Sequence, residues 1–140
     1  MTETSISRQA RLQAFLERTP FAQFLDFRCE VMGDEMTAIL PFRTSIIGNQ
    51  TIQALHGGAI GAFLELTAMA QLFLVSETSR FPKPVNLTID YLRQGKAEDL
   101  FGRASVTKQG RRIANVRAEA WQSERGKPVA TLNAHFLLTE

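Results

Sequence analysis

The chain is poor in the residues that build metal centres and disulfides. It has one cysteine, Cys29, and two histidines, His56 and His135, among 140 residues. A single cysteine cannot form an intrachain disulfide. So few cysteines and histidines, with no spaced acidic cluster beside them, also argue against a structural or catalytic zinc site. We therefore expect neither a metal nor a disulfide framework.

Signals of several other protein classes are missing as well. The serine-hydrolase string GxSxG, the P-loop and the dinucleotide-binding GxGxxG do not occur. The net charge is +2, but no run of five or six like charges marks a nucleic-acid tail. No secretory h-region and no apolar run of 18 residues is present. We expect a cytoplasmic protein that binds neither nucleic acid nor membranes, and the slight basic excess favours an anionic ligand.

The chain length suits one domain spanning residues 1–140, because 44% of the residues are hydrophobic and one core of this size is self-sufficient. An amphipathic helix is predicted before Pro20, which should end it. Alternating residues then predict a hairpin with strands near 27–32 and 36–42. Residues 45–54 are polar with little period, which predicts a loop.

Residues 58–75 are apolar on nearly every helical face, so this predicted helix must be covered on all sides. After Pro82 and Pro84 the chain turns extended, and turn signals divide the remainder into four strands. Within 112–122 and 130–138 small or apolar residues alternate with polar ones. This pattern predicts an antiparallel sheet with one buried face, against which a helix can lie closely. The fold class is therefore α+β.

The segment 55–65, LHGGAIGAFLE, joins two glycines at the mouth of that helix to one carboxylate. Gly57 and Gly58 let backbone N–H groups approach a ligand, and a helix N-terminus favours a developing oxyanion. Glu65 is the only carboxylate between Gly57 and Val75, and burial on an apolar helix would raise its pKa into the range of a general base. Alternatively, Glu65 faces a solvent gap or a subunit interface and has no chemical role.

This segment resembles the hotdog-fold thioesterases of the phenylacetate-pathway and 4-hydroxybenzoyl-CoA type. Their mark is His-Gly-Gly at the start of a central helix, with Asp or Glu eight residues after the first glycine. The resemblance continues through the lead-in strand, the polar loop, NLTIDYLR at 86–93 and KQGRR at 108–112. It implies a curved antiparallel sheet wrapped around a long central helix, assembled as a homodimer or homotetramer.

The resemblance also implies an acyl-CoA thioesterase acting on a medium-chain or aromatic acyl group, with coenzyme A as part of the substrate and no other cofactor. Eight residues of helix rise about 12 Å, so one subunit cannot easily bring Gly57 and Glu65 to one thioester. The family places its site at a dimer interface. There the Gly57 amide polarises the thioester carbonyl, and Glu65 of the other subunit attacks it or activates water.

Supporting roles follow from the same resemblance. Family members with an Asp at the acid position carry an asparagine six residues before His56, where this chain has Gln50 preceded by Asn49. Either amide could orient the water or carbonyl, or Gln50 could be a plain loop residue. His56 resembles a catalytic base, but in this motif it more often holds the loop and shapes the pocket.

Two further sets of residues are candidates for substrate contacts. The basic residues Lys108, Arg111 and Arg112, with Arg93 expected on a neighbouring strand end, could hold the phosphates of coenzyme A or form an ordinary solvated turn. Apolar side chains could line an acyl tunnel or belong to the core. These are Phe63, Met69, Leu72, Phe81 and Tyr91.

Two other functions remain open on the sequence. The first is a non-catalytic acyl-CoA-binding module, because the hotdog fold also serves ligand-responsive regulators. Such a regulator usually has an attached helix-turn-helix, and the segment before Phe27 is too short for one. The second is a hotdog hydratase or dehydratase, which needs a catalytic histidine with an Asp in a different motif from that of His56.

Overall fold

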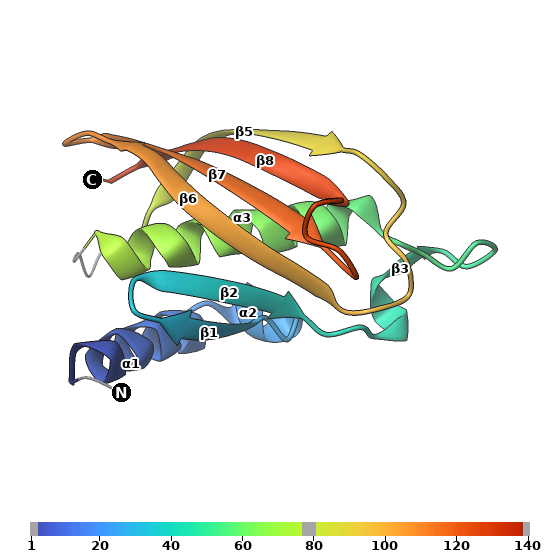
Figure 1. The fold of residues 1–140 in the computed structure, drawn as a ribbon, viewed down its shortest axis with the longest axis horizontal. Helices are drawn as coiled ribbons and strands as arrows, with labels where there is room; N and C mark the ends of the chain where they lie inside the picture. Colours follow the sequence, from blue (N-terminus) through green and yellow to red (C-terminus); the bar gives the residue numbers. More distant parts are fainter. Residues whose placement is uncertain (1–2, 77–80, 139–140) are drawn as a thin grey trace.

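A curved antiparallel sheet wraps around one long helix in the computed structural model, which describes residues 3–76 and 81–138 (Figure 1). The strand order is β1-β2-β6-β7-β8-β5, so β1 and β5 form the two edges. This confirms the α+β class that the sequence pattern predicts and the hotdog architecture that the family resemblance implies. The elements are α3 (Gly57–Val75), β1 (Arg28–Met32), β2 (Glu35–Leu40), β5 (Lys83–Tyr91), β6 (Leu100–Gln109), β7 (Ile113–Trp121) and β8 (Ala130–Leu137).

The helix α3 can lie close to the sheet because the inner faces of β6, β7 and β8 are built largely from small residues. The alanines of β7 that face inward are buried, as the alternation predicts. On β6, a Cβ atom at Gly102 would lie 2.7 Å from the Phe63 ring, so only glycine makes room for this aromatic side chain. By length and composition α3 could cross a membrane, but 67% of that apolar window is buried, as in the core helix of a sheet protein.

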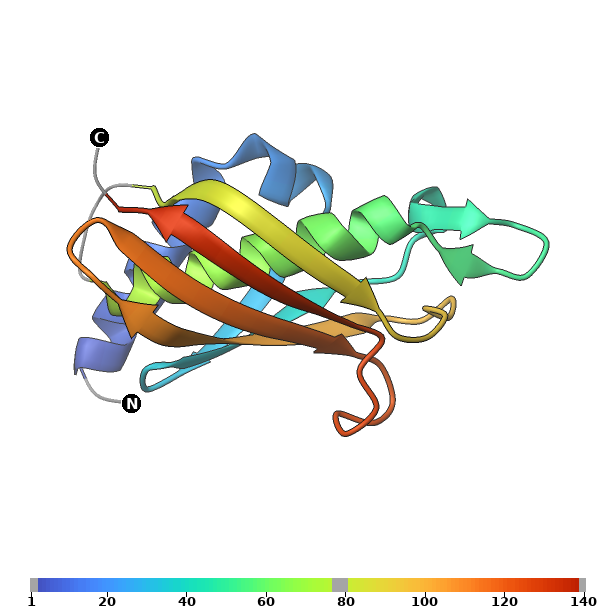
Figure 2. The same cartoon turned by 90° about the horizontal axis from the view of Figure 1, so that it is seen from above.

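The predicted N-terminal helix is α1 (Glu3–Glu17), and it lies on the side of α3 that the sheet leaves open (Figure 2). Its Phe15 ring is 4.7 Å from that of Phe73 in the C-terminal half of α3 and 4.8 Å from that of Phe81. Pro20 does more than end α1, because it begins a second, short helix, α2 (Pro20–Phe24). Proline suits the first helical position, where no intrahelical N–H bond is lost.

Two hairpins lie outside the four C-terminal strands, and the sequence predicts only the first. The predicted β1–β2 hairpin is present, and its turn includes Gly33 with φ +67°, a conformation that glycine adopts without strain. Residues 45–54, predicted as a loop, are instead partly ordered. They contribute to the turn η1 (Thr44–Ile46) and to a small hairpin of β3 (Ile47–Asn49) and β4 (Ala54–Leu55) that projects beyond the start of α3 (Figure 2). Such short strands give too little alternation to be recognised from sequence.

Candidate active site

One stripe of α3 remains accessible along a largely buried helix. It comprises Gly58, Ala62, Glu65 and Met69, which are exposed or half-buried and recur three or four residues apart. Successive residues of a helix are turned by about 100° around its axis. On this basis the stripe lies between two covered faces of α3. On one side Gly61 contacts β5, and on the other Phe73 contacts Phe15 of α1. The stripe is uncharged apart from Glu65, so the one acid of the helix lies on the helix's accessible apolar stripe.

The Glu65 carboxylate is half-buried on this stripe. No hydrogen bond or ion pair reaches it from the described part of the chain. Desolvation by burial raises the pKa of the Glu65 carboxyl above its usual value. The group is therefore neither neutralised nor held by a structural partner, and its carboxylate is free to act on a ligand.

The N-terminus of α3 is capped so that one backbone donor remains. The His56 ring accepts a hydrogen bond at Nδ1 from Gly58 N–H, 2.8 Å away. The His56 carbonyl accepts from the N–H groups of Ala59 and Ile60, at 3.0 and 3.2 Å. Among the described residues, the N–H of Gly57 has no acceptor. Because the carbonyl of the same peptide accepts two bonds, that N–H is polarised toward a further acceptor.

Two residues outside the His-Gly-Gly motif contact the start of α3, and no sequence motif indicates either of them. Gly48 in β3 packs under the motif, since a Cβ atom there would lie 2.7 Å from the His56 Cα. The hydroxyl of Tyr91, at the end of β5, donates to the Gly57 carbonyl at 2.7 Å. The sequence suggested Tyr91 only as an acyl-tunnel residue, because contacts between positions 57 and 91 depend on strand register. Of the other tunnel candidates, Phe63 and Leu72 are fully buried in the core.

The two candidate amides of the loop lie apart from the helix mouth. The Asn49 side-chain oxygen accepts from Thr51 N–H at 3.0 Å and so closes the turn of the β3–β4 hairpin. Gln50 is exposed at the tip of the same hairpin, and its side-chain amide has no partner among the described residues. Neither amide bonds to His56, Gly57 or Glu65 within one chain, and their roles stay predictions.

Comparison with known proteins places this geometry in a family. A family model described as the thioesterase superfamily matches residues 53–129. The chain belongs to the thioesterase superfamily.

Solved structures of this thioesterase fold extend over the whole chain. A Chromobacterium violaceum protein is 37% identical, with a TM-score of 0.75, over 100% of this chain and 98% of that one. A phenylacetic acid degradation-related protein from Ralstonia eutropha is 23% identical over 91% and 99%, with a TM-score of 0.76. A Bacillus halodurans protein, whose structure was determined with CoA, is 17% identical over 100% and 97%, also at 0.76. No curated protein matched the chain.

The basic residues of this thioesterase-superfamily chain do not form the single cluster that we expected. Lys108, Arg111 and Arg112 are exposed at the β6–β7 turn, near the C-terminal end of α3 (Figure 1). Arg93 follows β5 at the other end of the sheet and donates to the Pro128 carbonyl. The strand registers put Tyr91 level with Ala120 and Lys83 level with Ile113, so the two ends are roughly 24 Å apart. Placing Arg93 beside the turn was wrong for a single chain, while phosphate binding by the turn stays a prediction.

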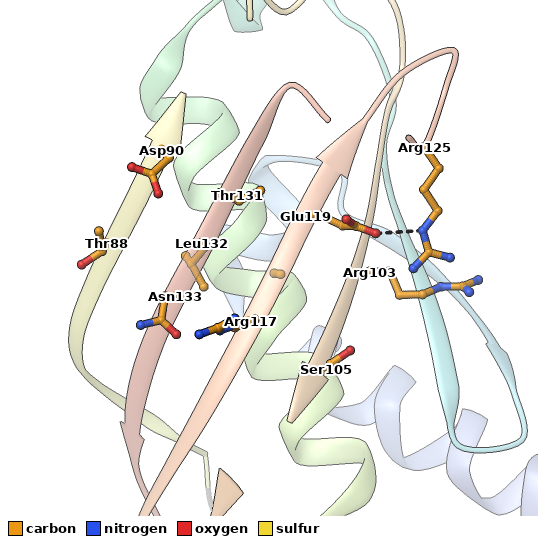
Figure 3. Close-up of a pocket in the computed structure, with 11 residues that line it drawn as sticks. Thr88, Asp90, Arg103, Ser105, Arg117, Glu119, Arg125, Thr131, Leu132 and Asn133 are labelled. Atoms are coloured by element: carbon orange, nitrogen blue, oxygen red, sulfur yellow. Dashed lines mark hydrogen bonds and ion pairs between the residues drawn. The ribbon is translucent and has the colours of Figure 1, made fainter. Parts of the chain in front are cut away.

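A hollow of about 620 Å³ lies on the outer face of the sheet, away from α3 (Figure 3). Its charged lining is partly paired, since Arg125 bonds to Glu119 at 2.8 Å, and none of the predicted site residues line it. Within 3–76 and 81–138, no three His, Cys, Asp or Glu residues gather as metal ligands. Burial raises the pKa of the Cys29 thiol to about 11, so it is a poor nucleophile at neutral pH. The α3 stripe is therefore the better candidate for the chemistry.

Proposed function

We propose that this thioesterase-superfamily chain hydrolyses the thioester of a medium-chain or aromatic acyl-CoA at a site shared by two copies. The observation that carries the proposal is Glu65: an unpartnered acid with a burial-raised pKa on the accessible apolar stripe of α3. A group of this kind in an apolar site suits a general base or nucleophile. The CoA in the Bacillus halodurans relative supports coenzyme A as the thioester carrier.

The proposed second copy binds along β5. This nine-residue edge strand pairs only with β8 and leaves large apolar side chains exposed, among them Val85 at 56% and Tyr91 at 54%. Long apolar edges invite pairing with another chain, and a twofold interface would use this edge from both copies. Because Gly57 and Glu65 are separated by about 12 Å along one helix, the partner is expected to supply the missing half of each site.

The chemistry we propose uses the free donor and the free acid. The Gly57 N–H donates to the thioester carbonyl and stabilises the oxyanion that forms there. Glu65 of the partner either attacks the carbonyl carbon, giving an acyl anhydride that water then hydrolyses, or takes a proton from the attacking water. In both routes the C–S bond breaks, the coenzyme A thiolate leaves and is protonated, and a carboxylic acid is released. Gln50 is the better candidate to orient the water, since the Asn49 side-chain oxygen already accepts from the backbone of its own turn.

The test is a thiol-release assay with short, medium, long and aromatic acyl-CoAs on the natural protein and on Glu65→Gln. We expect turnover of medium-chain or aromatic substrates by the natural protein and none by the variant. Calorimetry with a non-hydrolysable acyl-CoA thioether measures binding separately. Tight binding by both proteins without thiol release from either would contradict the proposal and favour a non-catalytic acyl-CoA-binding module.

A further inference from the structure

Tyr91 reaches the start of α3 from the edge strand β5, and its ring lies over the glycines. A Cβ atom added at Gly57 would be 3.5 Å from the Tyr91 ring, and one added at Gly61 would be 3.2 Å from the Tyr91 hydroxyl and 3.0 Å from Ile89. The hydroxyl donates to the Gly57 carbonyl at 2.7 Å. The contact at Gly57 would be an ordinary one, so it is the absence of a side chain at Gly61 that permits this approach.

The hydrogen bond of Tyr91 continues through a peptide group to the histidine of the motif. The Gly57 carbonyl and the Gly58 N–H belong to the same peptide, so a donor on the carbonyl strengthens the N–H as a donor. That N–H donates to His56 Nδ1 at 2.8 Å. A ring nitrogen that accepts a hydrogen bond carries no proton, which leaves the proton of the neutral ring on Nε2.

We propose that Tyr91 is a positioning residue for the oxyanion donor, acting through the Gly57–Gly58 peptide to hold His56 in the Nε2-protonated form. With Gly58 N–H engaged by His56, only Gly57 N–H remains for the substrate carbonyl. The inference rests on the proposed function, and it adds that the edge strand helps to set the donor geometry. A substrate bound beside β5 would therefore meet a helix start that the strand has already fixed.

The path from the Tyr91 hydroxyl through the Gly57–Gly58 peptide to His56, here called the relay, can be tested without any substrate. In ¹⁵N-labelled natural protein, we expect the His56 ring to show a protonated Nε2 and an unprotonated Nδ1, and the Gly58 amide to exchange slowly with solvent. Tyr91→Phe keeps the ring but removes the hydroxyl, and it should speed Gly58 exchange by about five- to tenfold, the size of one hydrogen bond. Unchanged exchange and unchanged ring nitrogen signals in Tyr91→Phe would overturn the relay.

Kinetics then ask whether the relay matters for turnover. Tyr91→Phe should lower kcat about tenfold and leave KM within about twofold, because the hydroxyl acts on the donor and not on substrate binding. Ser105→Ala is the control, since it removes a hydroxyl from the outer face of β6, away from the β5 edge, and it should leave kcat unchanged. An equal fall in both variants, or a change in KM alone, would contradict a positioning role.

Gly61→Ala provides an independent variant that keeps the hydroxyl. Alanine favours helix over glycine, so this change should not weaken α3. Its methyl group, however, would lie 3.2 Å from the Tyr91 hydroxyl and 3.0 Å from Ile89, so the hydroxyl must shift from its present place and kcat should fall as in Tyr91→Phe. The double variant should be no slower than either single one, since both break the same contact. Additive losses would refute the action of Tyr91 through the peptide. Absence of turnover in the natural protein would instead refute the proposed function. In that case the His56 nitrogen signals and the Gly58 exchange rate still test the Tyr91 proposal.

Discussion

The two halves of α3 have different roles. The N-terminal half, from Gly57 to Glu65, carries three glycines and keeps most of the accessible stripe. The C-terminal half is almost wholly buried, and α1 lies over it (Figure 2). The Phe15 ring of α1 packs against Phe73. The helix therefore stabilises the fold with one half and leaves the amide and the acid of the other half uncovered. Stability and activity should be separable by substitutions within this one helix.

The largest effect is expected at Glu65. Glu65→Gln keeps the size and polarity of the side chain but removes the base or nucleophile, so kcat should fall by about 10²- to 10⁴-fold. Thiol release measures the loss, and urea unfolding should give a stability no lower than that of the natural protein. A stable variant that retains full turnover would remove Glu65 from the chemistry.

Phe73 should show the opposite behaviour. It is 3% exposed and packs on Phe15 and Phe81. Phe73→Ala leaves a cavity and should lower the free energy of unfolding by about 3–5 kcal/mol, while kcat per folded molecule stays unchanged. Phe24→Ala is the control: that ring is 70% exposed, so its loss should cost under about 0.5 kcal/mol in denaturant unfolding. Similar losses at the two positions would show that burial by α1 is not what stabilises this half.

His56 should affect both stability and activity, because it caps α3 and accepts a hydrogen bond from Gly58 N–H. His56→Ala should lower the free energy of unfolding by about 1 kcal/mol, the usual worth of an N-cap, and should also lower kcat. His135→Ala is the control. That histidine lies on the outer face of β8, so its loss should leave kcat unchanged. If only stability falls in His56→Ala, the cap does not help to position the Gly57 donor.

The smallest effect is on the pH dependence of stability. The pKa of Glu65 is raised in the folded protein, so its contribution to stability is fully present below the unfolded-state pKa. That contribution is lost as pH rises through the raised folded pKa. The free energy of unfolding of Glu65→Gln should therefore change slightly less with pH across this window than that of the natural protein. Over the same window, kcat/KM of the natural protein should rise as the carboxylate forms. Urea unfolding at a series of pH values, with identical profiles for both proteins, would contradict the burial of this acid.

Most of the fold could be predicted because it follows from local pattern. The apolar residues of α3 and the alternating alanines of β7 directly indicate a buried helix against a sheet. The spacing of Gly57 and Glu65 is likewise a property of one continuous helix. Contacts that depend on how strands register could not be predicted in this way. The bond of Tyr91 to the Gly57 carbonyl was therefore missed, and Arg93 was expected at the wrong end of the sheet.

Gly57 offers a clean way to remove one backbone donor. It is the first residue of α3, a position where proline is favoured, and His56 before it is extended at φ −67° and ψ 129°, as a residue preceding proline should be. Gly57→Pro should therefore remove the N–H and keep the helix. Gly57→Ala retains the N–H, and its Cβ would meet only an ordinary 3.5 Å contact with Tyr91, so it is the matched control.

A complementation assay tests the shared site most directly. Gly57→Pro and Glu65→Gln proteins, each inactive alone, are co-expressed, and thiol release is measured on the mixture. If each site takes Gly57 from one copy and Glu65 from the other, mixed dimers hold one intact site, and activity should return to about a quarter of the natural level. A mixture that forms mixed dimers yet stays inactive would contradict a site shared between two copies.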